Sequence, residues 1–362
     1  MLDYRILLIP FAISALLTPL VKQYSFFAKA FALENERTVH HGKISRIGGV
    51  SIFLAFMITS AFFIQTDRAM DGIMLGGSIM FFAGLVDDLI DLKPKQKLAL
   101  ELVAAVVLIY YGVSADVIRI LGFSIDMPLI TITFTILWIA GITNAVNLID
   151  GLDGLAGGMS TIILVVIGCV AIVERRTDVV TITFILASST AGFLIYNAHP
   201  ASIFMGDCGS LFLGFMISAI SLLGFKSSTI VTLALPILLL LLPIIDTLSA
   251  ILRRTLKGMK FMQADKSHIH HLLMKQFGHR NTVIIMCGIT ALFGLSAFIY
   301  MLNTWAGLVV IALLLFGIEI FIEKSAMINE HFHPLIGLWH RIWKAFVQIR
   351  INLIRKFYKS KA

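Results

Sequence analysis

Carboxylates and lysines gather at one point of an otherwise apolar chain, between residues 84 and 97. Asp87, Asp88 and Asp91 are followed at once by three lysines between positions 93 and 97. Adjacent carboxylates repel one another unless a cation lies nearby. Asp87 and Asp91 are four residues apart, so a continuing helix would place them on one face. Two interpretations stay open: a helix-end carboxylate pair neutralised by the lysines, or a pair that takes part in a reaction.

A second polar string runs from Thr143 to Gly158. Asparagine and aspartate recur in it at intervals of three, at Asn144, Asn147, Asp150 and Asp153, and a glycine follows each aspartate. Glycine permits a positive φ and close backbone approach, so we expect a tight loop here. Oxygen ligands at this density suit Mg²⁺, which takes few carboxylates together with phosphate oxygens. The alternative is polar packing between membrane helices.

A third string, Gly206-Asp207-Cys208-Gly209-Ser210, stands at the start of an apolar run. The free N–H groups at a helix amino terminus are suited to a phosphate. An aspartate at this place could hold the metal that bridges the phosphates, or it could act only as a helix N-cap.

Three histidines lie close together further along the chain, at His268, His270 and His271. No cysteine accompanies them, and their spacing differs from the common zinc patterns. Imidazoles also donate hydrogen bonds to phosphate oxygens, and we favour this role. Asp246, inside an apolar segment, is interpreted as a structural residue that supports the site or pairs with Arg253 or Arg254.

The elements that must position these strings are membrane helices. The 362 residues are 58% hydrophobic and 14% charged, against about 45–50% and about 25% for soluble domains. The mean hydropathy is +0.93. Eleven apolar segments are predicted to span the membrane, at about 4–21, 47–65, 72–87, 97–113, 129–146, 156–174, 179–197, 209–225, 229–251, 282–302 and 304–323. The predicted fold is an all-α polytopic membrane protein.

Charge predicts the orientation of these segments. Most of the 29 lysine and arginine residues fall on one side when the amino terminus is placed outside, as the positive-inside rule requires of cytoplasmic loops. The net charge of +8 therefore reflects membrane topology rather than nucleic-acid binding. The polar strings and the carboxyl terminus are then cytoplasmic. The three histidines lie in a long cytoplasmic loop at about 253–280. The three scattered cysteines predict neither a disulfide framework nor a zinc site.

Two regions are predicted along the chain. Residues 1–325 form the integral membrane domain, and residues 326–362 form a basic amphipathic tail on the cytoplasmic side. Apolar residues in the tail recur at intervals of three and four, with lysine and arginine between them. This pattern is typical of a helix lying on anionic membrane lipids.

Taken together, the Asp-Asp, Asn-x-x-Asn-x-x-Asp-Gly, Gly-Asp-x-Gly-Ser and His-x-His-His strings resemble those of the polyprenyl-phosphate N-acetylhexosamine-1-phosphate transferase family. The resemblance extends up to residue 325. This family includes the muramoyl-pentapeptide phosphotransferase of peptidoglycan synthesis and the N-acetylglucosamine-1-phosphate transferases that start teichoic acid, O-antigen and enterobacterial common antigen. The string 267–273 is similar to the second branch, since the first typically carries a His-His-His-Phe-Glu string there.

The resemblance implies an enzyme that transfers N-acetylglucosamine-1-phosphate from UDP-N-acetylglucosamine to undecaprenyl phosphate and releases UMP. This would be the first membrane step of a cell-envelope polysaccharide such as wall teichoic acid. It also implies a bacterial inner-membrane location, a cytoplasmic active site, and Mg²⁺ as cofactor with Mn²⁺ as a substitute. Alternatives are the muramoyl-pentapeptide transferase activity and, from another class, a membrane transporter. A homodimer stays open.

By position, the resemblance also implies roles for single residues. Asp87 and Asp88 would be catalytic at the lipid phosphate, and Asp207 and Asn147 would bind the metal. Substrate contacts would come from Lys43, Arg46, Asn144, Asp150, Asp153, Gly206, Ser210, His268, His270 and His271. Among these, the histidines would face the donor diphosphate, and Asp150 and Asp153 would shape the nucleotide-sugar pocket.

Overall fold

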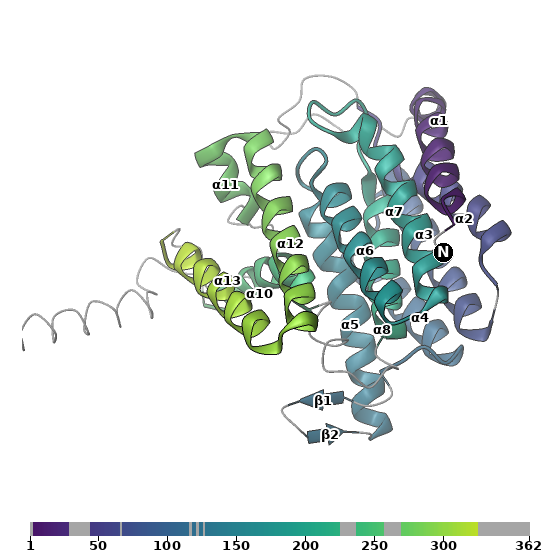
Figure 1. Cartoon of the computed structure of the whole chain (residues 1–362). Helices are drawn as coiled ribbons and strands as arrows, with labels where there is room; N and C mark the ends of the chain where they lie inside the picture. Colours follow the sequence, from purple (N-terminus) through teal and green to yellow (C-terminus); the bar gives the residue numbers. More distant parts are fainter. Residues whose placement is uncertain are drawn as a thin grey trace, which may run out of the picture.

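The architecture comes from a computed structural model of the chain (Figure 1). It describes residues 3–28, 44–65, 67–115, 118–120, 123–125, 127–224, 237–256 and 269–324. Several predicted features lie outside these residues: Lys43, His268, the basic tail 326–362 and the first part of the ninth apolar segment.

The described residues form helices and one small hairpin. The helices are α1 Arg5–Ala28, α2 Gly49–Phe63, α3 Arg68–Ile90, α4 Pro94–Tyr110, α5 Pro128–Ile149, α6 Leu155–Val173, α7 Thr177–Asn197, α8 Gly206–Gly224, α10 Leu241–Leu256, α11 Ile269–Phe277, α12 His279–Leu302 and α13 Thr304–Lys324. The strands β1 Ile118–Ile120 and β2 Phe123–Ile125 pair antiparallel. Apart from this hairpin, which no sequence pattern predicted, the all-α prediction is confirmed.

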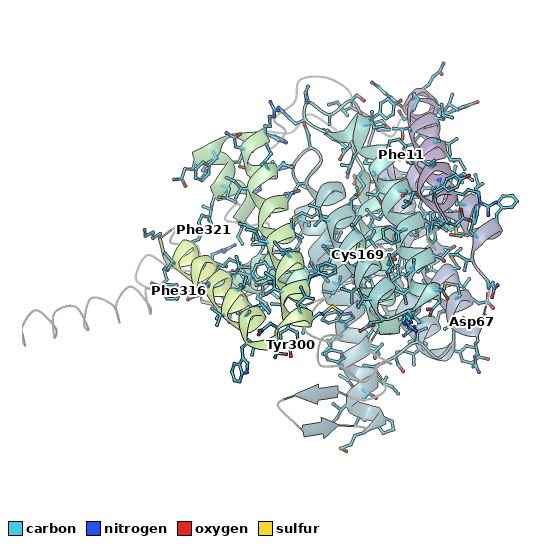
Figure 2. All side chains as sticks on the ribbon, in the orientation of Figure 1. Phe11, Asp67, Cys169, Tyr300, Phe316 and Phe321 are labelled. Carbon is cyan, nitrogen blue, oxygen red and sulfur yellow. The ribbon has the colours of Figure 1, made fainter. Side chains whose placement is uncertain are left out.

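Eight of the described helices are long and apolar enough to cross a membrane: α1, α3, α5, α6, α7, α8, α12 and α13. Their outer faces expose large apolar side chains such as Phe11 and Phe316, which suits contact with lipid (Figure 2). The chain is a multi-pass membrane protein. The segments predicted at 47–65 and 97–113 are the shorter helices α2 and α4, of 15 and 17 residues, so the total of eleven spans stays a prediction.

Two sequence predictions about the region after residue 229 were wrong. The ninth segment was expected to end near 251, but α10 continues to Leu256, so that Arg253 and Arg254 belong to a helix rather than to a loop. The expected long loop also contains the helix α11. Helix α10 is amphipathic and not uniformly apolar, with Arg253 buried in the protein. A search for long apolar runs therefore misplaces the ends of such helices.

Helix α8 lies at the centre of the bundle and carries one of the polar strings. In its apolar window 89% of the residues are buried, against 17% for α13. It packs against α3, α5 and α2. Two contacts near its start bring backbones together: a Cβ on Gly49 would lie 2.2 Å from the nitrogen of Gly209, and a Cβ on Gly84 would lie 2.2 Å from the carbonyl oxygen of Asp207. Small residues allow this close approach between membrane helices.

The turn between α3 and α4 fixes the position of the lysines relative to the aspartates. Asp91 ends α3 in the left-handed conformation with φ of 52°, and Pro94 begins α4. Proline is favoured in the first helical turn because its missing N–H is not needed there. Only Asp91, Leu92 and Lys93 separate the two helices, so α4 turns back against α3. This reversal directs Lys97 toward the end of α3.

Candidate active site

Asp88 joins the end of α3 to the start of α8. One of its carboxylate oxygens accepts from the backbone N–H of Asp207 and the other from that of Cys208, each at 2.9 Å. The Asp88 side chain is fully buried, and the guanidinium of Arg46 lies 4.0 Å from it. Backbone N–H groups at a helix start carry partial positive charge, so this carboxylate is well satisfied. Asp88 therefore fixes the position of the start of α8 relative to the end of α3.

Lys97 connects two other carboxylates. Its ammonium nitrogen lies 2.7 Å from Asp207 and also forms a direct ion pair with Asp87. Asp87 accepts a further hydrogen bond, 2.6 Å long, from the backbone of Leu92. One cation thus lies between the carboxylates of α3 and α8. Without that cation, two carboxylates this close together would disfavour their charged forms.

Asn147 brings α5 to the same point. Its Nδ2 donates to Asp207 at 2.9 Å and to the hydroxyl of Ser210 at 2.8 Å. Asn144 and Asn147 are three residues apart on α5, and both donate hydrogen bonds to side chains of other helices. Asn144 donates to the buried carboxylate of Glu101 at 2.6 Å.

The donor set around Lys97 fits a divalent cation of the Mg²⁺ class. The protein already places a cation, the Lys97 ammonium, between Asp87 and Asp207. Mg²⁺ takes one or two carboxylates and completes its octahedron with water and phosphate oxygens. Asn147 would add an amide oxygen after a half-turn of its side chain, because the oxygen and nitrogen of an amide are interchangeable in position.

The expected phosphate site at the start of α8 is occupied by the protein itself. The N–H groups of Asp207 and Cys208 were expected to face a phosphate, yet both donate to Asp88. Gly206 is needed for backbone geometry: its φ is +73°, and a Cβ there would lie 1.7 Å from the carbonyl oxygen of Arg46. The Ser210 side chain is fully buried against Asn147. These two N–H groups at the helix start therefore bind a carboxylate of α3 and not the expected phosphate.

The loop after α5 carries the remaining aspartates. Asp150 is half-buried, and desolvation, reinforced by the nearby charges of Asp207, Asp88 and Asp153, raises its pKa well above the usual carboxyl range. Loss of solvent and like charges both favour the neutral acid. Asp150 therefore belongs to the electrostatic neighbourhood of the α3–α8 carboxylates, as its place in the string predicted.

Asp153 has partners that the sequence did not suggest. Its carboxylate lies 2.8 Å from the Nδ1 of His199 and accepts from the backbone N–H of Ala201 at 3.1 Å. His279, at the start of α12, lies 3.8 Å away. His199 and His279 are single histidines without a motif around them, so nothing in their local sequence marks them.

Four further residues lie in or near helices α10, α11 and α4. His270 and His271 belong to α11, where His271 is half-buried. Asp246 of α10 accepts from the backbone N–H of Ile269, the first residue of α11, at 2.9 Å. This contact gives Asp246 the structural role that was expected for it. Glu101 was missed, although a carboxylate inside an apolar segment is expensive enough to have marked it as functional or structural.

Comparison with known proteins shows the family of this chain. The chain is 38% identical over 357 residues to a probable undecaprenyl-phosphate N-acetylglucosaminyl 1-phosphate transferase of Bacillus subtilis, covering 95% of this chain and 99% of that protein. The chain belongs to the polyprenyl-phosphate N-acetylhexosamine-1-phosphate transferase family. The model of glycosyl transferase family 4 matches residues 70–225, which hold Asp87, Asp88, Asn147 and Asp207.

Two other relatives separate the branches of this transferase family. A decaprenyl-phosphate N-acetylglucosaminephosphotransferase of Mycobacterium tuberculosis is 31% identical, with 84% of this chain and 85% of that protein covered. A phospho-N-acetylmuramoyl-pentapeptide-transferase of Streptococcus pneumoniae is 34% identical, but over only 49% of this chain and 58% of that protein. The likeness to the N-acetylglucosamine branch thus extends over much more of the chain. This sugar-phosphate transferase is grouped with that branch.

Proposed function

We propose that this transferase moves N-acetylglucosamine-1-phosphate from UDP-N-acetylglucosamine to undecaprenyl phosphate and releases UMP. The observation that carries the proposal is the match over 95% of the chain to a relative named for this acceptor and this sugar. The muramoyl-pentapeptide alternative has support over only half of the chain. A transporter has no support from the relatives, whose names are those of transferases.

In the proposed reaction, an oxygen of the lipid phosphate attacks the β-phosphorus of the donor. The new P–O bond forms as the bond from that phosphorus to the oxygen of UMP breaks, so one diphosphate linkage replaces another. A phosphate monoester is already mostly dianionic at pH 7, because its second pKa is about 6. A general base is therefore less necessary than for an alcohol, and catalysis depends mainly on positioning and charge stabilisation. A two-step route through an aspartyl phosphate is the rival mechanism.

The geometry suggests different roles for the two adjacent aspartates. Asp87 and Asp207 share Lys97, so we assign these three residues to the reaction centre. Asp88 has both oxygens occupied by α8 and serves as a positioning residue. Mg²⁺ held by Asp207, Asp87 and Asn147 would supply charge neutralisation for the diphosphate. Lys97 would then turn toward the phosphates, where its ammonium stabilises the departing UMP.

We also propose a cytoplasmic site with the amino terminus outside. The support is the distribution of lysine and arginine, which are concentrated on the side of the α3–α4 turn. Figure 1 shows the β1–β2 hairpin at one end of the bundle and α11 toward the other. In a variant without native cysteines, a membrane-impermeant thiol reagent applied to intact cells should label Ser124→Cys of the hairpin and not Lys95→Cys. The reverse pattern would overturn the orientation.

Transfer by the purified protein in detergent tests the reaction. Radiolabelled UDP-N-acetylglucosamine, undecaprenyl phosphate and Mg²⁺ are supplied, and label is followed into the lipid phase. We expect transfer by the wild type, its loss with EDTA, and a decrease of at least about 100-fold in Asp207→Asn, which removes a metal ligand and a charge. Asp178→Asn, at an exposed ion pair with Arg176, is the matched control and should stay active.

The donor decides between the branches in the same assay. Label from UDP-muramoyl-pentapeptide but not from UDP-N-acetylglucosamine would assign the protein to the peptidoglycan branch. No transfer from any UDP-sugar would overturn the proposed activity.

A further inference from the structure

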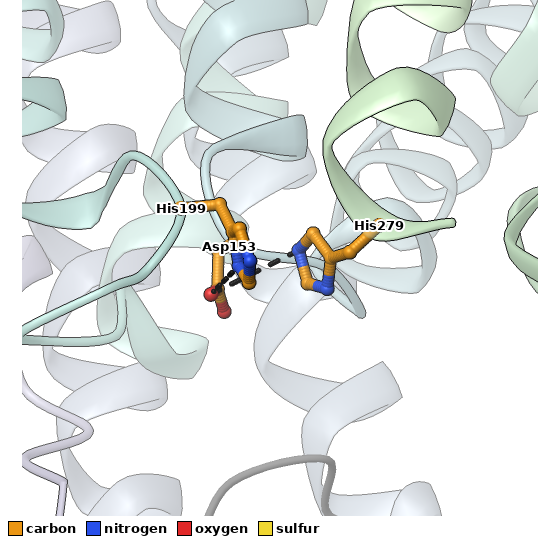
Figure 3. A group of neighbouring side chains, drawn as sticks. All are labelled: Asp153, His199 and His279. Carbon is orange, nitrogen blue, oxygen red and sulfur yellow. Dashed lines mark hydrogen bonds and ion pairs between the residues drawn. The ribbon is translucent and has the colours of Figure 1, made fainter. Parts of the chain in front are cut away.

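A second cluster of ligand-type side chains lies apart from Lys97 and involves two histidines. Asp153 follows α5, His199 follows α7, and His279 is the first residue of α12. Figure 3 shows the two imidazoles and the carboxylate directed toward one another. One ligand atom from each residue lies within 4.8 Å of the other two. Three separate elements thus converge on one point.

The distances between ligand atoms in this cluster are close to those in a metal site. Oδ2 of Asp153 lies 2.8 Å from Nδ1 of His199 and 3.8 Å from Nε2 of His279. Zinc binds imidazole nitrogen and carboxylate oxygen at about 2.0–2.2 Å, so tetrahedral ligands lie about 3.3–3.5 Å apart. The two observed distances bracket this value. Because the two rings are stacked, one of them would have to turn out of the stack for both nitrogens to point at one ion.

The surroundings hold the carboxylate in place for this role. The Asp153 side chain is 3% exposed, and the backbone N–H of Ala201 donates to the same oxygen that faces both histidines. The imidazole rings stack with their centroids 4.2 Å apart and their planes inclined by 20°. Such supporting hydrogen bonds orient ligands and raise metal affinity. Two imidazoles and a carboxylate would leave one tetrahedral position for water or another oxygen.

We propose that Asp153, His199 and His279 form a site for a zinc-class divalent transition metal that anchors the start of α12 to the loops after α5 and α7. Imidazole ligands favour Zn²⁺ and its neighbours, whereas the oxygen-rich set around Asp207 favours Mg²⁺. The two sites therefore select different ions. Because α11 directly precedes α12, a metal at His279 would also limit the movement of the helix that carries His270 and His271.

Binding of Co²⁺ tests this site independently of the transferase reaction. Protein purified without a polyhistidine tag is stripped with EDTA and titrated with Co²⁺ while visible absorption is recorded. We expect bands of tetrahedral or five-coordinate Co²⁺ at one ion per chain, lost on addition of Zn²⁺ but kept in millimolar Mg²⁺. His199→Ala and His279→Ala should weaken binding by at least about tenfold.

Two matched variants and one stability measurement complete the test. His271→Ala removes a neighbouring imidazole, and Asp207→Asn removes the proposed Mg²⁺ site; both should retain the Co²⁺ spectrum. Zn²⁺ should raise the melting temperature of the wild type and of these two variants, but not that of His279→Gln, which keeps a polar side chain if His279→Ala fails to fold. No Co²⁺ spectrum in the wild type, or an unchanged spectrum in the His199 and His279 variants, would overturn the proposal.

Discussion

The two acidic clusters of this transferase differ in what neutralises them. Around Asp207 the carboxylates come from the ends of α3 and α8, and a permanent cation, Lys97, lies between them. Around Asp153 the residues come from two loops and a helix start, and the partners are imidazoles. The first cluster carries its own cation on a lysine side chain, whereas the imidazoles of the second are of the ligand type that binds transition metals. We therefore assign the first cluster to the proposed phosphoryl transfer and the second to the proposed attachment of α12.

The largest effect is expected at Gly206, the residue directly before Asp207 of the first cluster. Gly206→Ala would place a methyl group 1.7 Å from the carbonyl oxygen of Arg46 at a φ of +73°. We expect a loss of stability above about 3 kcal/mol, or no folded protein, since strain and a backbone clash combine. Gly288→Ala in α12, where a Cβ meets nothing within 4 Å, is the control and should be neutral or stabilising. Thermal unfolding in detergent measures both, and equal melting temperatures would refute the assumed rigidity of the first cluster.

Removing the permanent cation should have the next largest effect. Lys97→Met leaves Asp87 and Asp207 side by side without the cation between them, and we expect transfer to fall by about 100-fold to 1,000-fold. The same change should strengthen Mn²⁺ binding, measured by electron paramagnetic resonance, because a competing cation is gone. Lys95→Met, at an exposed position of the same turn, should affect neither. A variant that loses Lys97 and transfers normally would remove the main contrast between the clusters.

A smaller effect is expected at the support behind Asn144. Glu101→Ala leaves the amide of Asn144 without the acceptor that now lies 2.6 Å away, in a buried place. Such an unsatisfied group costs about 1–3 kcal/mol of stability. Glu101→Gln keeps an acceptor oxygen and should recover most of the loss. If the Ala and Gln variants unfold at the same temperature, the hydrogen bond between Glu101 and Asn144 does not contribute to the stability of the protein.

The smallest effect should appear at Asp150, whose carboxyl pKa is raised by desolvation and by Asp207, Asp88 and Asp153. A raised folded-state pKa means that the charged form destabilises the fold, so stability falls as pH rises above the unfolded pKa of about 4. Without divalent cations, Asp150→Asn should therefore melt at a higher temperature than the wild type at pH 7–8. The difference should shrink toward pH 4, where both side chains are neutral. A difference independent of pH would show that Asp150 is not part of the charge network.

Sequence reasoning predicted the first cluster better than the second, for a physical reason. The sequence marks the first cluster because burying charged and amide side chains in a membrane costs free energy. Such side chains stand in short strings at Asp87, Asp88, Asn147 and Asp207. The pairing of Lys97 with Asp207, 110 residues away, depends on the α3–α4 turn and on the burial of α8, which no local pattern reveals. The predicted apolar segments match best where a helix is long and uniformly apolar. The end of the amphipathic α10 was misplaced, and the short α11 was missed.

The second cluster could not have been found in this way. His199 and His279 are 80 residues apart and each stands alone, so their meeting at Asp153 is a product of the tertiary fold. Asp153 was recognised from its string, but its partners were not. The roles predicted for Lys43 and His268 stay predictions, because these residues lie outside the part of the chain that the structure describes.

The capping of α8 by Asp88 has a consequence for inhibitor design. Compounds that imitate a diphosphate often rely on the positive end of a helix to hold their anionic group. Here that end already binds an internal carboxylate through Asp207 and Cys208, so an anionic mimic gains little from it. A cationic group would reach Asp87 and Asp207 only by displacing the Lys97 ammonium that now lies between them.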